Sequence, residues 1–203
     1  LSLLLFSFFY LFFFHFIFHQ LDRNIYSFPE AEEIIIFFSL IINDGFVESY
    51  DHTGYPLFIL LSQIFKLLKL IGFLEISNIS ELLLFDLNSN DHKKLYLTLR
   101  IFAFILHLLT YFLIIKIFDK IFENSFFKIL VIIFTLIVPN LNYLFLGSLT
   151  SAFGFFLFLL SILFFLNLDK KFYIFAGTFF LLLAVQTKIQ FLPFLFIIPC
   201  FFA

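Results

Sequence analysis

The sequence predicts an all-α protein built as a multi-pass bundle of transmembrane helices. The chain is 63% hydrophobic and 13% charged, whereas a soluble domain is about 45–50% apolar and about 25% charged. A chain of 203 residues with this composition has more apolar side chains than one core can bury. The composition excludes soluble enzymes and disordered tails, and a single cysteine excludes a disulfide scaffold.

Apolar runs set the predicted spans, because about 20 apolar residues cross a bilayer as a helix. The runs are residues 1–19, 95–118, 126–138, 149–166, 172–185 and 191–202. The first run is too long for the core of a signal peptide, so we expect it to be a signal anchor or a first span. Several later runs are short, and Pro139 and Pro193 interrupt apolar stretches. One of these segments is therefore either a span or a re-entrant segment.

The charges orient these spans. Residues 22–91 hold eleven acidic and three basic residues, a net charge of −8, and the rest of the chain carries +6. Lysines in short loops stay on the cytoplasmic side, and they lie at Lys116, Lys120, Lys128, Lys170 and Lys171. We therefore expect a multi-pass protein of the cell membrane whose acidic loop, residues 20–93, is extracytoplasmic.

Two helices are predicted inside this acidic loop. Residues 30–42 lack glycine and proline, and Pro29 suits a first helical turn, where acidic side chains are also favourable. Residues 57–70 place Ser62, Lys66 and Lys69 on a narrow stripe of an otherwise apolar helix. That pattern indicates a helix lying in the membrane interface, with a true span as the alternative.

Two further features of the loop concern its turns. Residues 43–56 form a connector whose glycines and Pro56 impose bends, and it carries Asp51 and His52. Residues 75–90 form an added element, with Ser80 as the predicted N-cap of a short helix over residues 81–85. Each carboxylate here is either a solvated loop residue or part of a site.

Short motifs in a fixed order resemble the GT-C superfamily of membrane glycosyltransferases, which use polyprenyl-phosphate sugars and include the aminoarabinose and protein mannosyl transferases. The motifs are Pro29-Glu30-Ala-Glu-Glu33, Asp51-His-Thr-Gly-Tyr-Pro-Leu57, Leu97-Thr-Leu-Arg100, Val138-Pro-Asn140, Ala176-Gly177 and Gln186-Thr-Lys188. The resemblance spans nearly the whole chain. Since family members are commonly more than twice this length, we expect the chain to be an N-terminal part of one GT-C-like membrane domain.

The resemblance implies an enzyme that moves a sugar from a polyprenyl-phosphate donor to an acceptor on the extracytoplasmic face. The family's general base maps onto Glu30, where aspartate is more frequent, and Glu33, one turn on, is the alternative base. A base is needed because the attacking group loses its proton at the anomeric carbon.

The leaving polyprenyl phosphate requires cations or hydrogen-bond donors, and the resemblance implies His52, Arg100 and Lys188 for this task. It also implies Asp51 as a ligand of a divalent metal, the one cofactor considered. The expected partners are the lipid-linked sugar, a lipid, glycan or protein acceptor, and membrane lipids, with no nucleic acid. As alternatives, Arg100 and Lys188 only reach toward the interface from helix ends, and His52 is a loop residue with one hydrogen bond.

Two other classes of protein remain as alternatives. A multi-pass transporter would carry its ionisable groups in mid-span, whereas here the acids collect in a loop. A non-catalytic membrane subunit would only scaffold a partner protein. The enzyme hypothesis predicts that Glu30, Asp51, His52, Arg100 and Lys188 surround one cavity.

Overall fold

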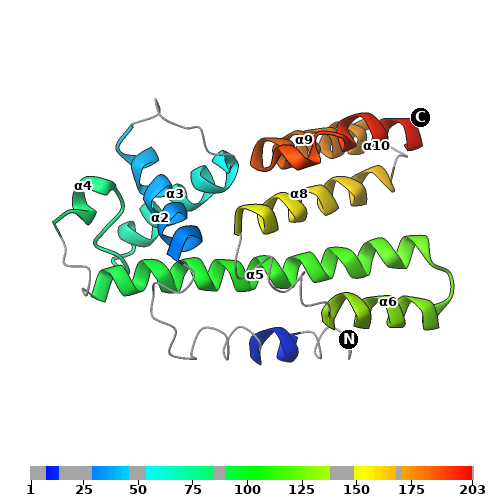
Figure 1. The fold of residues 1–203 in the computed structure, drawn as a ribbon, viewed down its shortest axis with the longest axis horizontal. Coiled ribbons are helices and arrows are strands. Elements are labelled where there is room, and N and C mark those ends of the chain that lie inside the picture. Colours follow the sequence, from blue (N-terminus) through cyan, green and yellow to red (C-terminus); the bar gives the residue numbers. More distant parts are fainter. Residues whose placement is uncertain are drawn as a thin grey trace. The chain divides into compact units, whose positions relative to one another are not determined.

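The structure is a computed structural model that describes residues 8–13, 29–45, 54–84, 90–137, 149–167 and 171–202. Every regular element in these residues is a helix, which confirms the predicted all-α class for the described part of the chain (Figure 1). The chain divides into two compact units. Unit 1 comprises Leu1–Asp22 and Phe104–Ala203, and unit 2 comprises Arg23–Ala103. Of the predicted span at 1–19, residues 8–13 are described, and they are helical.

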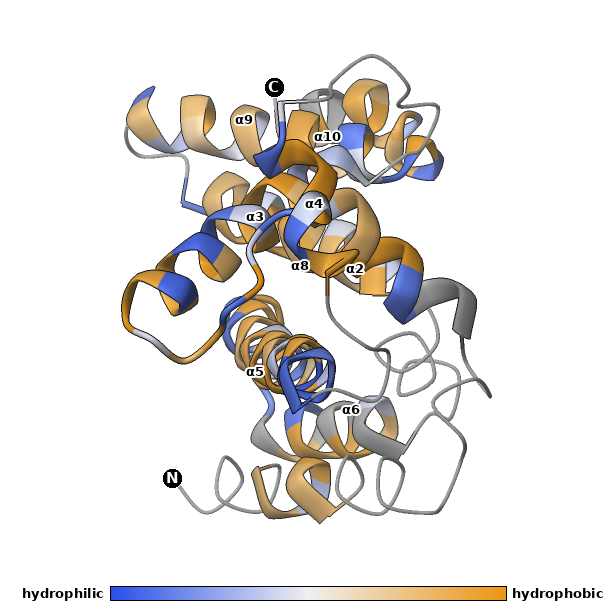
Figure 2. Cartoon of the chain, turned by 90° about the vertical axis from the view of Figure 1, so that its left-hand side faces the viewer, coloured by the Kyte–Doolittle hydropathy of each residue, from blue (hydrophilic) through white to orange (hydrophobic). Residues whose placement is uncertain are grey.

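Helix α5 (Asn90–Ile121) is the one described helix long and apolar enough to cross a membrane. It contains the predicted span at 95–118, and hydrophilic residues lie at both of its ends, of which the N-terminal one is nearest the viewer in Figure 2. Large apolar side chains stay exposed along one face of α5, at Leu97, Ile101, Ile105, Leu109 and Phe112. This stripe covers about 22 Å of helix. An exposed apolar stripe of this length is typical of a surface that contacts lipid or another protein.

The remaining helices of unit 1 coincide with the later apolar runs. They are α6 (Ser125–Ile137), α8 (Leu149–Phe165), α9 (Lys171–Thr187), the short 3-10 helix η2 (Ile189–Phe191) and α10 (Phe194–Phe202). Each is shorter than the roughly 20 residues of a typical span, so their crossing of a membrane stays a prediction. Pro193 separates η2 from α10, where the sequence predicted an interruption.

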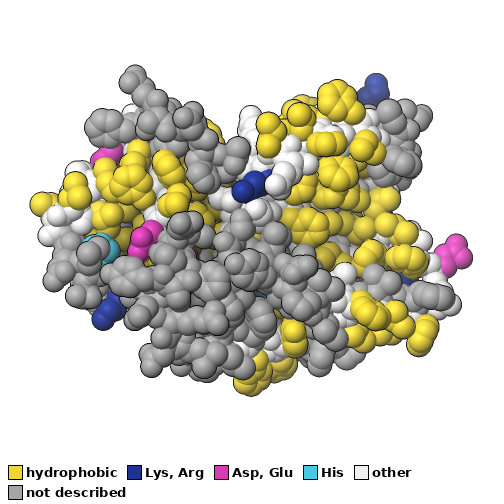
Figure 3. All heavy atoms as spheres, in the orientation of Figure 1, with side chains coloured by type: hydrophobic (Ala, Val, Ile, Leu, Met, Phe, Trp, Pro, Cys, Tyr) yellow, Lys and Arg dark blue, Asp and Glu magenta, His cyan; other side chains and the backbone are white. Residues whose placement is uncertain are grey.

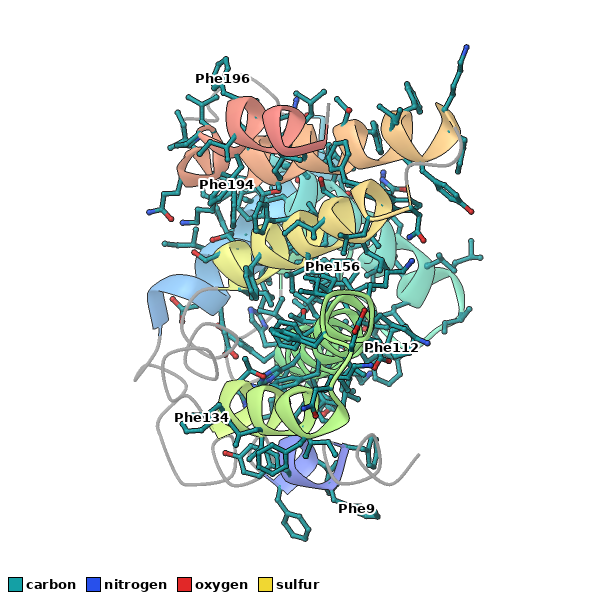
Figure 4. All side chains as sticks on the ribbon, turned by 90° about the vertical axis from the view of Figure 1, so that its right-hand side faces the viewer. Phe9, Phe112, Phe134, Phe156, Phe194 and Phe196 are labelled. Atoms are coloured by element: carbon teal, nitrogen blue, oxygen red, sulfur yellow. The ribbon has the colours of Figure 1, made fainter. Side chains whose placement is uncertain are left out.

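Unit 1 is held together by apolar contacts between these helices. Leu113, Ile114 and Ile117 of α5 form a buried cluster with Leu159 of α8, and Phe156 packs against it. Figure 4 shows Phe156 between α8 and α5, whereas Phe9, Phe134 and Phe196 point away from the helices. Hydrophobic side chains also cover much of the surface of this unit that is visible in Figure 3. The phenylalanines therefore serve both the core and an exposed apolar surface.

Gly154 of α8 allows a close approach of the segment that follows α9. A Cβ atom at this position would lie 2.9 Å from Cε2 of Phe191 and 3.5 Å from Cγ2 of Thr187. The Phe191 ring in turn stacks on Phe158 of α8, with 5.3 Å between ring centroids. Residue 154 therefore has no room for a side chain unless the Phe191 ring moves, and small residues at helix contacts of this kind are frequent in membranes.

Replacing Gly154 with valine is expected to lower the free energy of unfolding by about 1–3 kcal/mol, the usual cost of overpacking. The measurement is the thermal midpoint of the purified chain in detergent. Thr178→Val is the matched control, since Thr178 is exposed and its hydroxyl bonds only to the Ile174 carbonyl of its own helix. Adding Phe191→Leu to the Gly154→Val chain should recover part of the loss. An unchanged midpoint in Gly154→Val would contradict the close contact.

Unit 2 is built on two packed helices, α2 (Pro29–Asn43) and α3 (Tyr55–Leu70). Both helices were predicted, and α2 begins at Pro29 as expected for a proline in the first turn. The Phe38 and Phe58 rings stack across the contact with centroids 5.3 Å apart. The side of α3 that carries Leu57, Leu61 and Phe65 is buried.

The end of α3 turns sharply at Gly72, whose φ of 75° suits glycine. The Gly72 N–H donates to the Lys69 carbonyl and the Phe73 N–H to that of Leu68, both at 2.9 Å, which is a Schellman motif. The chain then enters α4 (Ile79–Leu82), a single helical turn. We call residues 67–84, from the end of α3 through α4, the elbow.

Two adjacent residues at the end of α2 fix the elbow. The Asn43 amide donates to the carbonyls of Ser62, at 3.1 Å, and Ser77, at 2.6 Å. The Asp44 carboxylate accepts hydrogen bonds from the backbone N–H groups of Ile79 and Ser80. These contacts join residues 19 to 36 positions apart, so the elbow is an ordered part of unit 2.

The predicted cap of the short helix was wrong. Asn78 is the N-cap of α4, and its side-chain oxygen accepts from the Glu81 N–H at 2.9 Å. Ser80 lies inside the helix, where its hydroxyl bonds to Asp44 and Asn78. Asparagine and serine are equally good caps, and Asp44, directly after α2, binds the N–H groups of Ile79 and Ser80 and so favours the earlier start.

Glu81 links α4 to α3. Its carboxylate binds the Lys69 ammonium and accepts from the Ser77 N–H at 2.8 Å. Burial alone would raise the pKa of Glu81, but the hydrogen bond and charge of Lys69, with the Ser77 N–H, hold it below its ordinary value. Because the folded-state pKa is lowered, this contact stabilises the elbow above the unfolded-state pKa and is lost as the pH falls through the lowered value.

The polar stripe predicted on α3 is divided between two environments. Ser62 is fully buried and its hydroxyl donates to the Ile59 carbonyl at 2.7 Å. Lys69 is held by Glu81, and Lys66 alone of the three is exposed. The three residues therefore do not form one continuous polar surface, and the predicted position of this helix in the membrane interface stays a prediction.

Candidate functional site

The acidic first turn of α2 is tied to α5 by an ion pair between Glu32 and Arg100. Arg100 donates from Nε to Oε1 at 3.2 Å and from Nη2 to Oε2 at 3.1 Å. Both side chains are partly buried. Two parallel hydrogen bonds of this kind fix the orientation of both groups. The contact joins residues 68 positions apart, so the acidic turn has a defined place beside the N-terminal half of α5.

Glu33 lies next to this pair but faces outward. Its carboxylate is exposed and accepts a hydrogen bond of 3.3 Å from the Tyr96 hydroxyl. Tyr96 and Arg100 are four residues apart, so they lie on one face of α5. A single face of α5 thus contacts two consecutive carboxylates of α2.

The spacing of α2 explains why its two carboxylates differ. Glu32 is three and four residues before Ile35 and Ile36, which are buried, and therefore lies above the packed side of the helix. Glu33 is four residues before Phe37, which is exposed. Glu32 can therefore reach a neighbouring helix, while Glu33 remains open to solvent.

The structure brings together only part of the predicted site. Glu33 and Arg100 share the surface just described, with Glu32 between α2 and α5. The backbone of Glu30 lies in the first turn of α2, whereas its side chain lies outside the described part of the chain, as do Asp51 and His52 entirely. The prediction that all of these residues surround one cavity stays a prediction.

Lys188 belongs to unit 1 and is described there. It lies between α9 and η2 in an extended conformation and is half-buried. Within the described residues its ammonium makes no hydrogen bond or ion pair.

Glu32 and Tyr96 are site residues that the sequence prediction missed. Arg100 lies in a mostly apolar helix, and a partly buried guanidinium of this kind requires an acidic partner. The three glutamates in the first turn of α2 are candidate partners of Arg100. Their presence indicates that an ion pair can form, but it does not identify which glutamate binds.

The described residues do not support a metal centre. No group of three histidine, cysteine, aspartate or glutamate side chains among them is placed to hold a metal ion. Asp51, the predicted metal ligand, lies outside these residues. No chemical step is therefore assigned to a metal.

The cluster of Glu32, Glu33, Tyr96 and Arg100 combines a group that can take up a proton with a group that can bind an anion. Glu33 is an exposed carboxylate, and a carboxylate within hydrogen-bond reach of a hydroxyl can act as a general base. Arg100 uses two of its five N–H donors on Glu32. The other donors are suited to phosphate oxygens.

Compared with protein-family models, with curated proteins and with solved structures, the chain has no match.

Proposed function

We propose that the chain is the N-terminal part of a GT-C-type glycosyltransferase, a multi-pass protein of the cell membrane that transfers a sugar from a polyprenyl-phosphate donor to an extracytoplasmic acceptor. The observation that carries the proposal is the contact of Glu32 and Glu33 with Arg100 and Tyr96. It joins an acidic helix start to one end of the helix that is able to span a membrane. The proposed transfer needs a lipid-linked phosphate and a proton-accepting carboxylate close together at the membrane surface.

The length of α5 supports this position. Arg100 and Lys120 are separated by 20 residues, or about 30 Å of helix, which is close to the thickness of the hydrocarbon core. Near the C-terminal end of α5, the Lys116 ammonium lies 5.5 Å from the centroid of the Phe112 ring. The acidic cluster and the basic end of α5 thus lie about one hydrocarbon thickness apart.

Contacts inside unit 1 support the proposed sidedness. The Lys120 ammonium bonds to the Asn167 side chain, so the C-terminal ends of α5 and α8 lie together. These two ends lead into the two lysine-bearing loops that the positive-inside rule assigns to the cytoplasm. Lys171 and Lys188 lie at opposite ends of α9, about 25 Å apart along its axis. This separation supports an extracytoplasmic position of Lys188, provided that α9 crosses the membrane.

In the proposed reaction the acceptor hydroxyl or amine attacks the anomeric carbon of the donor from the face opposite the phosphate. The new bond to the acceptor forms as the bond to the phosphate oxygen breaks, and the polyprenyl phosphate leaves with the electron pair. Glu30 takes the acceptor proton, with Glu33 as the second choice. Arg100, His52 and Lys188 stabilise the charge that develops on the phosphate, and Asp51 is the residue to test for a divalent metal.

The test is transfer itself, measured with the full-length protein in lipid vesicles. A polyprenyl-phosphate sugar labelled in the sugar should lose its label to an acceptor fraction from the cell envelope, with release of polyprenyl phosphate. Heat-treated protein is the control. A protein that moves a labelled solute across the vesicle but leaves the donor intact would be a transporter, and one that does neither would be a non-catalytic subunit.

A further inference from the structure

The elbow carries the most exposed apolar side chains of unit 2 among the described residues. Leu70, Leu83 and Leu84 are 85%, 80% and 83% exposed, and Leu67 and Ile71 are more than half exposed. Figure 3 shows hydrophobic side chains on the surface of the part of the chain where α3 and α4 lie in Figure 1. An ordered segment with five such side chains marks an interaction surface.

The contact between Lys69 and Glu81 brings the two halves of this surface together. Lys69 directly precedes Leu70 and Ile71, and Glu81 is two and three residues before Leu83 and Leu84. The ion pair and the hydrogen bonds of Asn43 and Asp44 fix the elbow. The backbone that carries its exposed leucines is therefore ordered.

The elbow also contacts the start of the helix that is able to span a membrane. The Lys94 ammonium lies 5.8 Å from the centroid of the Phe73 ring, and Lys94 is paired with Asp91 in the first turn of α5. Lys94 lies about 9 Å of helix rise beyond Arg100. Headgroups add roughly 5–8 Å to each side of the hydrocarbon core, so Phe73 lies at about the outer edge of the headgroups if Arg100 marks the edge of the hydrocarbon.

The charges around the elbow fit a lipid surface. Glu81 and Asp91 are each neutralised by a lysine. Lys66 and Lys93 are exposed and make no ion pair within the described residues. The acids around the elbow that no lysine pairs with are Glu75, which is exposed, and Asp44, whose carboxylate is bound to the backbone of α4. Lysines beside exposed leucines are typical of surfaces that bury apolar side chains at the acyl boundary and place ammonium groups among phosphates.

We propose that the elbow is a membrane-docking surface, which inserts Leu67, Leu70, Ile71, Leu83 and Leu84 into the headgroup boundary of the bilayer that α5 crosses. This assigns a role to residues 75–84, the part of the predicted added element that lies in the elbow. The proposal needs no catalytic activity, so it stands or falls separately from the proposed function.

The chain contains no tryptophan, so one introduced indole reports on its own position. Leu70→Trp and Leu84→Trp are made separately in the full chain, with Glu75→Trp as the control in the same elbow. Each is reconstituted in phosphatidylcholine vesicles with and without one-third phosphatidylglycerol, and in vesicles with brominated acyl chains. All three positions are exposed, and far-ultraviolet circular dichroism checks that each variant keeps its helices.

We expect Trp emission at positions 70 and 84 to shift to shorter wavelength and to be quenched at least twofold more by bromine near the top of the acyl chain than emission at position 75. Equal quenching at the three positions, or none, overturns the proposal. An emission shift that depends on the protein-to-lipid ratio and not on brominated lipid would instead assign the surface to a second copy of the chain.

Discussion

Replacing Glu30 with glutamine abolishes sugar transfer while the donor still binds. Glutamine keeps the size of the side chain but cannot take up the acceptor proton, and general base catalysis contributes about 10²–10⁴-fold to a rate. Glu30 is in the first turn of α2, two residues before the glutamate that binds Arg100. We expect kcat to fall by this factor. The dissociation constant of the donor should stay within about twofold, because a group that acts only in the transition state affects kcat and not donor binding.

Glu33→Gln is the matched control for this change. Glu33 is exposed and bonds weakly to Tyr96, so its loss should reduce kcat far less than the loss of Glu30. The reverse order would move the base to Glu33. If neither variant slows transfer, a carboxylate base in the first turn of α2 is wrong.

Arg100→Gln is expected to lower kcat/KM for the donor about 10- to 100-fold, through KM because Arg100 binds the phosphate and through kcat because it stabilises the charge that develops there. Hydrogen bonds to charged groups contribute about 1.5–3 kcal/mol, and each 1.4 kcal/mol is a tenfold change in affinity. The same substitution also breaks the ion pair with Glu32. Donor affinity is best measured in the Glu30→Gln chain, where no turnover intervenes.

A charge exchange separates these two roles of Arg100. The double variant Glu32→Arg with Arg100→Glu restores an ion pair between α2 and α5 but places the positive charge on the other helix. If Arg100 binds the phosphate, the exchange should recover the thermal midpoint and leave the donor affinity low. Recovery of both would mean that Arg100 only holds the two helices together.

Much of the helical fold could be predicted from local patterns. Pro29 and the acidic turn after it identify the start of α2, and the long apolar run identifies α5. These elements depend on residues close together in the chain. The start of α4 could not be predicted in this way, because Asn78 and Ser80 are both good caps and the choice depends on Asp44, more than 30 residues earlier.

The partners within the site were harder to predict for a related reason. A helix with apolar residues on nearly every side shows no preferred packing face, so the sequence of α2 alone does not reveal which glutamate faces α5. The stacking of Phe38 on Phe58 sets which side of α2 packs on α3, and this places Glu32 toward Arg100. The same packing buries Ser62, which is why a polar stripe on α3 was a poor guide to its surface.

The ion pair between Glu32 and Arg100 also affects the order in which unit 2 can fold during synthesis. Glu32 is synthesised 68 residues before its partner, which at about 5–20 residues per second is an interval of about 3–14 s. During this interval α2 can pack on α3, and Asn43 and Asp44 can reach Ser77 and Ile79, but the carboxylate of Glu32 has no guanidinium to meet. The first turn of α2 is thus an early-made part of unit 2 whose partner on α5 is made late.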